Sequence, residues 1–91
     1  VTFCPHALLQ ARRRGISNFT LRLVITHHDR SQKVPGLCRA LWVSPKRRKS
    51  LVKSGLPAAD VDRLAGVRLI ISLRDDAVVT VEHTTARRHW A

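Results

Sequence analysis

Prolines and glycines divide this chain into short segments and thereby limit the length of each helix it can form. Three pairs enclose segments of helical length: Pro5 with Gly15, Pro45 with Gly55, and Pro57 with Gly66. Proline is favoured in the first turn of a helix, where its missing N–H is not needed, and glycine readily takes the left-handed conformation that ends one. The pattern predicts helices at residues 5–14, 45–54 and 57–65.

The segment after the first of these helices predicts another. Ser17 is a favourable N-cap residue, and three apolar residues then recur at helical spacing: Leu21, Val24 and Ile25. The helix should stop in the polar stretch that begins at His27 and ends at Lys33. Residues 5–33 are therefore expected to hold a helical pair.

Two later stretches are typical of β-strands. After the turn at Pro35-Gly36, the residues up to Val43 are rich in apolar and aromatic side chains. Residues 67–83 contain two β-branched runs around a polar turn, and the second run alternates so that three side chains are expected on one face: Val79, Val81 and His83. These stretches predict a small antiparallel sheet.

The order of these elements indicates one α+β domain over residues 1–91, with a helical insertion before the C-terminal hairpin. We expect five regions along the chain: a helical pair at 5–33, a strand region at 34–43, a basic helical segment at 45–65, a hairpin at 67–83 and a basic tail at 84–91.

A formal net charge of +11, from 17 Lys and Arg against 6 Asp and Glu, exceeds what solubility requires. A polyanion is the partner that such a charge favours, because neutralised phosphates release counterions on binding. A nucleic acid, and RNA first, is the expected partner. The alternative is a basic surface coat without a specific partner.

The cations gather in three clusters that are candidates for nucleic-acid binding. The first lies at the end of the first helix, where the helix dipole alone could explain it; the second lies in a helical first turn, where it opposes the dipole. The third combines guanidinium groups with an aromatic ring that could stack on a base, or belongs to a frayed terminus. The candidates are Arg12, Arg13, Lys46, Arg47, Arg48, Lys49, Arg87, Arg88 and Trp90.

Histidine supplies the candidates for acid–base chemistry. His6, near a helix start, and His83, at a strand end, are considered because imidazole exchanges protons near neutral pH; a structural histidine is the alternative for either. The spacings Cys4-x-His6 and His27-His28 match no established zinc pattern. No metal and no cofactor is expected, and the phosphate-loop and nucleophile-elbow motifs of other enzymes are absent.

The segment His6-Ala7, six residues, then Arg14-Gly15-Ile16-Ser17 resembles the opening of a family of short bacterial domains of unknown function. Residues 67–72 and 76–83 are similar to the last two strands of that family. The family is grouped with the BrnT and RelE-like toxins, small basic ribonucleases neutralised by an antitoxin. The chain departs from the motif at Gln10, where the family usually has arginine.

This resemblance implies two N-terminal helices packed on a small twisted antiparallel sheet, and a metal-independent endoribonuclease that acts on messenger RNA. It implies catalytic roles for His6 and Arg14. His83 is a third catalytic candidate, which rests on its imidazole and not on the resemblance. Two alternatives stay open: a non-catalytic nucleic-acid or ribosome-binding module, and a protein-interaction domain for an acidic partner such as an antitoxin. We expect a cytoplasmic protein, since its apolar runs are too short for a bilayer, with a homodimer as a further possibility.

Overall fold

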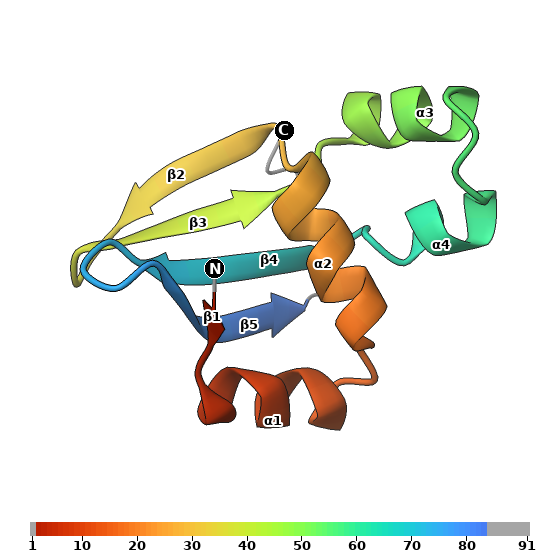
Figure 1. The fold of residues 1–91 in the computed structure, drawn as a ribbon. Coiled ribbons are helices and arrows are strands. Elements are labelled where there is room, and N and C mark those ends of the chain that lie inside the picture. The colour runs from red at the N-terminus through yellow and green to blue at the C-terminus, as the bar shows by residue number, and fades with distance from the viewer. Residues whose placement is uncertain (1, 84–91) are drawn as a thin grey trace.

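The computed structural model describes residues 2–83, and Figure 1 shows how these elements are arranged. The elements in chain order are β1 (Thr2–Phe3), α1 (Pro5–Arg13), α2 (Asn18–His27), β2 (Arg30–Val34), β3 (Cys38–Trp42), α3 (Pro45–Lys53), α4 (Ala58–Asp62), β4 (Val67–Ser72) and β5 (Ala77–His83). The α+β class expected from the sequence is confirmed.

The five strands form one sheet in the order β1-β5-β4-β3-β2. β2, β3, β4 and β5 pair antiparallel, but the short β1 pairs parallel with β5 at Thr2 and Phe3. The sheet is therefore mixed rather than antiparallel throughout. β1 was not predicted, because two residues are too few to show alternation.

Strand β2 corrects the expected helical pair at 5–33. Helix α2 ends at His27, and Arg30–Val34 then forms an edge strand that pairs with β3. The four residues from Arg30 to Lys33 are exposed and polar, so the strand has no apolar alternation to show in the sequence. Its pairing with β3 across the turn at Gly36 and Leu37, both at positive φ, specifies it instead.

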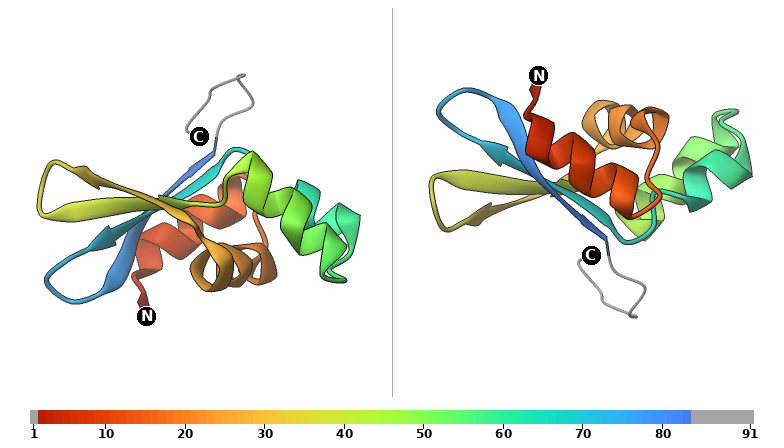
Figure 2. Two further views of the ribbon diagram at one scale, coloured as in Figure 1. Left: turned by 90° about the horizontal axis from the view of Figure 1, so that it is seen from above. Right: turned by 90° about the horizontal axis from the view of Figure 1, so that it is seen from below.

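Helices α1 and α2 cover one face of the sheet, and no helix lies on the other face in the described part of the chain (Figure 2). α1 packs on β5, and α2 packs on β3 and β4. The main core lies between these layers and includes Ala7, Leu21, Leu69 and Val81, each 1% exposed or less. A smaller cluster on the opposite face contains Ala40, Trp42 and Ile70.

A β-bulge in β5 changes the expected strand faces. Ile70 pairs with Thr80 and Ile71 with Val78, so Val79 is the extra residue between them. Val81 belongs to the main core, whereas Val79 packs with the cluster on the other face. The expectation that Val79 and Val81 share one face was therefore wrong.

The connection between β3 and β4 is much longer than their pairing requires. Antiparallel neighbours can be joined by a tight turn, yet residues 43–66 intervene and form α3 and α4. Figure 1 shows both helices beside the end of the sheet, opposite the β2–β3 and β4–β5 turns. We call residues 43–66 the helical arm. Leu51, Val61 and Leu64 anchor it in the main core, each at most 3% exposed.

Candidate functional site

A pocket of about 450 Å³ lies where the α1–α2 turn, the helical arm and the end of β5 meet. Its lining contains two guanidinium groups, one imidazole, one carboxylate and two hydroxyls. The lining residues are Arg14, Gly15, Ile16, Ser17, Thr20, Asp62, Arg63, Ala65 and His83. Three segments far apart in the sequence thus supply polar and charged groups to one hollow.

The α1–α2 turn holds its place through local chemistry. Gly15 takes a φ of 71°, in the left-handed region that favours glycine, and Ile16 then donates its N–H to the Ala11 carbonyl at 2.8 Å. Ile16 is 9% exposed and packs in the main core. The Ser17 hydroxyl begins α2 by accepting from the Thr20 N–H at 3.2 Å. The turn, held by these contacts, forms one wall of the pocket.

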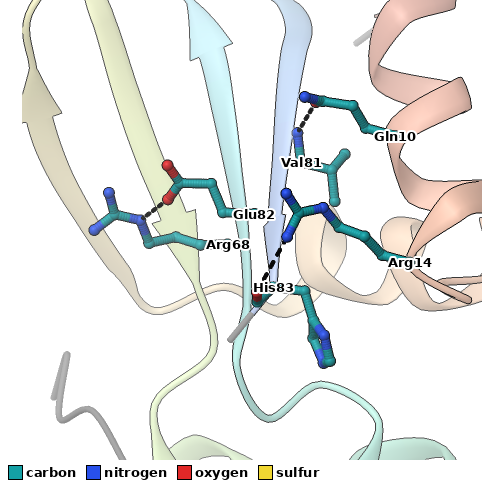
Figure 3. A network of polar contacts seen from close by, with 6 residues as sticks. All are labelled: Gln10, Arg14, Arg68, Val81, Glu82 and His83. Carbon is teal, nitrogen blue, oxygen red and sulfur yellow. Dashed lines mark hydrogen bonds and ion pairs between the residues drawn. The ribbon is translucent and has the colours of Figure 1, made fainter. Parts of the chain in front are cut away.

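Arg14 and His83 meet at the edge of this wall. The Arg14 guanidinium donates through Nη1 to the His83 carbonyl oxygen at 3.3 Å, which fastens the end of α1 to the end of β5. In Figure 3 the His83 imidazole is turned away from this guanidinium. The contact uses the backbone carbonyl of His83, so the imidazole ring takes no part in this hydrogen bond.

The arm supplies Asp62 and Arg63, which the sequence analysis missed. Arg63 is the C-cap residue of α4 and is exposed, as is Asp62. Nothing local in the sequence distinguishes this arginine from other exposed cations. Its place in the pocket depends on how Val61 and Leu64 dock the arm on the core.

The structure does not bring His6 to this pocket. His6 is exposed in the first turn of α1, whereas Arg14 is the C-cap residue of the same helix. Eight residues of helix separate the two by about 12 Å along the axis. Of the three candidate catalytic residues, only Arg14 and His83 line the same pocket.

The side chains of the cluster Arg12-Arg13-Arg14 lie at different surfaces, because successive helical residues point about 100° apart. Arg12 lines a different hollow of about 250 Å³ with Leu8 and Asn18, between α1 and α2. Arg13 is exposed. Only Arg14 reaches the candidate site.

In the basic first turn of α3, the arginines bind backbone carbonyls and the lysines are exposed to solvent. Arg47 donates through Nε to the carbonyl of His27, the last residue of α2, at 3.3 Å, and Arg48 donates to the Val43 carbonyl at 3.2 Å. Both are half-buried, while Lys46 and Lys49 are exposed. Bonds to backbone carbonyls therefore offset part of the unfavourable dipole interaction of this cluster.

Gln10 supports the edge of β5 with its side chain. Its side-chain oxygen Oε1 accepts from the Val81 N–H at 3.1 Å (Figure 3). β1 pairs with β5 only at Ala77 and Val78, so the edge of β5 needs an acceptor at Val81. An arginine side chain has no acceptor and could not replace Gln10 in this bond.

The sheet face without helices carries its own polar row. Arg68 forms an ion pair with Glu82 at 2.8 Å, and its guanidinium lies 5.7 Å from the ring centre of Trp42. Trp42 is only 7% exposed, so its ring is not open for stacking on a base. The candidates of the third basic cluster, Arg87, Arg88 and Trp90, lie outside the described residues.

Among residues 2–83, no group of three or more His, Cys, Asp or Glu side chains is placed to hold a metal ion. Cys4 and Cys38 are free and half-buried, and the Cys4 sulfur accepts from the Ala7 N–H at 3.4 Å to begin α1. None of the helices described is long and apolar enough to cross a bilayer.

Comparison of the chain with known protein families, curated proteins and solved structures finds no match.

Proposed function

We propose that the protein binds RNA and cleaves it without a metal ion, in the manner of the toxin-like ribonucleases that its first helix resembles. The observation that carries the proposal is that Arg14, Arg63 and His83 line one pocket. Two guanidinium groups suit a phosphodiester, because planar N–H donors match phosphate oxygens. An imidazole beside them suits proton transfer near neutral pH.

Cleavage would follow from these groups with the RNA as its own nucleophile. The ribose 2′-hydroxyl attacks the adjacent phosphorus while the His83 imidazole takes its proton. The 2′-oxygen–phosphorus bond forms, the bond to the 5′-oxygen breaks, and that oxygen takes a proton from water. Arg14 and Arg63 stabilise the negative charge that develops on the phosphate oxygens. The products are a 2′,3′-cyclic phosphate and a 5′-hydroxyl.

Two observations favour a second candidate, an RNA-binding module without catalysis. The pocket holds one histidine, since His6 lies at the far end of α1. The Arg14 guanidinium also has a structural contact with the His83 carbonyl. A pocket with two cations and no second histidine binds a phosphate without needing to break it.

The test compares the two histidines directly. Purified protein is incubated with a 5′-labelled structured messenger RNA in excess chelator, and cleavage is followed for the wild type, His83→Asn and His6→Asn. Loss of a general base lowers the rate by about 100-fold or more. We expect that loss in His83→Asn and near-wild-type cleavage in His6→Asn.

The outcomes separate the candidates. Equal cleavage by both variants would overturn the role of His83, and intact but retarded RNA with wild-type protein would establish the binding module. A substrate with deoxyribose at the cleaved position must stay intact if the 2′-hydroxyl is the nucleophile. Absence of any RNA retardation at low salt would overturn both candidates.

A further inference from the structure

The exposed side of α3 carries a straight row of lysines that the candidate pocket does not use. Lys46, Lys49 and Lys53 follow one another at spacings of three and four residues, so they lie on one face of the helix. All three are exposed, and α3 contains no acidic residue. The buried residue of this helix, Leu51, lies on the opposite side. We call these three residues the lysine row.

The arginines between these lysines are occupied within the protein. Arg47 and Arg48 bind the carbonyls of His27 and Val43. The lysine row is therefore the part of the basic cluster that faces solvent. Its length along the helix, from the first lysine to the last, is about 10 Å, enough to contact more than one phosphate of a nucleic-acid strand.

The composition of the helical arm excludes one mode of RNA recognition. Residues 43–66 contain no aromatic residue and no histidine. Single-stranded RNA is bound largely by stacking of its bases on aromatic side chains. The exposed cations of α3 are lysines, which contact phosphates, and a double-stranded stem is the form of RNA that presents chiefly its backbone and ribose hydroxyls.

The arm also links the lysine row to the pocket. α3 carries the row, and Asp62 and Arg63 at the end of α4 line the pocket. α3 and α4 pack against each other, so the lysine row and the pocket belong to the same part of the molecule.

We propose that the lysine row binds the phosphate backbone of a double-stranded RNA stem that adjoins the strand held in the pocket. The inference rests on the proposed function and adds the class of substrate: a stem with an unpaired extension, rather than an unpaired strand alone. Recognition at the row is independent of sequence, because lysines contact phosphates and not base edges.

The experiment uses two RNA probes and three proteins. One probe is a hairpin with a single-stranded extension, and the other is the extension alone; binding is measured by fluorescence anisotropy over a range of salt concentrations. The test variant combines Lys46→Gln, Lys49→Gln and Lys53→Gln. The control variant removes the same charge near the β2–β3 and β4–β5 turns, with Lys33→Gln, Arg39→Gln and Arg74→Gln.

The wild type should bind the hairpin probe more tightly than the extension, and the test variant should lose that preference while keeping its affinity for the extension. The salt dependence of hairpin binding should fall by about one unit of slope per lysine removed. The control variant should keep the preference. Thermal melts verify that each variant is folded.

Three results would overturn the inference: an unchanged preference in the test variant, an equal loss for both probes, or an equal loss in the control variant. In each of these cases the wild type still binds the extension, so the proposed function stands. Failure of the wild type to bind either probe would instead remove the proposed function and this inference together.

Discussion

Ser44 donates its hydroxyl hydrogen to the Asp29 carboxylate at 2.6 Å, and its backbone N–H donates to the same carboxylate at 2.8 Å. The Ser44 hydroxyl oxygen also accepts from the Arg47 N–H at 3.1 Å and so begins α3. One carboxylate after α2 thus orients the residue that starts the helical arm. Ser44 is 2% exposed, so these hydrogen bonds satisfy a buried polar group.

This pair makes part of the stability depend on pH. Partial burial acts to raise the pKa of Asp29, but the hydrogen bonds from the Ser44 hydroxyl and N–H outweigh it and hold the pKa below its ordinary value. A carboxylate with a lowered folded pKa stabilises the fold at higher pH and loses that contribution as the pH falls through the folded pKa. Asp29→Asn should therefore destabilise the protein at neutral pH, and the difference from wild type should shrink as the pH falls below about 4.

Urea unfolding at several pH values measures this difference in the free energy of unfolding, with Asp62→Asn as a control for an exposed carboxylate. A difference that is constant with pH would contradict the role assigned to the Asp29 carboxylate.

Replacing Gly15 in the α1–α2 turn should destabilise the protein through backbone conformation alone. A Cβ added at Gly15 would meet no atom within 4 Å, yet φ is 71° there. An L-residue in this conformation costs about 1–2 kcal/mol. Gly15→Ala should lower the melting temperature by about 5 °C or more, while Gly15→Asn should lose less, because asparagine tolerates the left-handed region. Equal melting temperatures for Gly15→Ala and wild type would show that the turn has another conformation.

Gln10 offers a test of the free edge of β5. Gln10→Met keeps the size of the side chain but leaves the Val81 N–H without its acceptor, which costs about 1–2 kcal/mol for a partly buried donor. Gln10→Glu keeps an acceptor and should be close to wild type. Hydrogen exchange at the Val81 amide is the direct readout and should be faster in Gln10→Met. Equal protection in all three proteins would place the acceptor elsewhere.

The sequence could predict the features that depend on only a few neighbouring residues. Gly15 ends α1 and Ser17 and Ser44 begin helices because caps act over one turn. β2 was missed because its polar residues acquire a strand conformation only by pairing with β3. The bulge at Val79 was missed because alternation alone does not reveal an extra residue.

The candidate site was predictable only in part, for a similar reason. Arg14 and His83 were considered from a motif and a residue type, and the structure places both at one pocket. Arg63 joins them through the docking of the arm, which no local pattern encodes. His6 lies apart because a helix that is nine residues long separates its first turn from its last.

At the basic start of α3, charge-matched variants should have opposite effects on stability and on RNA affinity. Arg47→Gln with Arg48→Gln removes two bonds to backbone carbonyls and should lower the free energy of unfolding by about 1 kcal/mol. Lys46→Gln with Lys49→Gln removes two exposed charges and should leave stability nearly unchanged. Affinity for RNA should follow the reverse order, with the greater loss in the lysine pair. Urea unfolding and anisotropy on the same four proteins, wild type and a quadruple variant included, measure both effects. Equal losses of affinity in the two pairs would mean that total charge, rather than the exposed face of α3, determines binding.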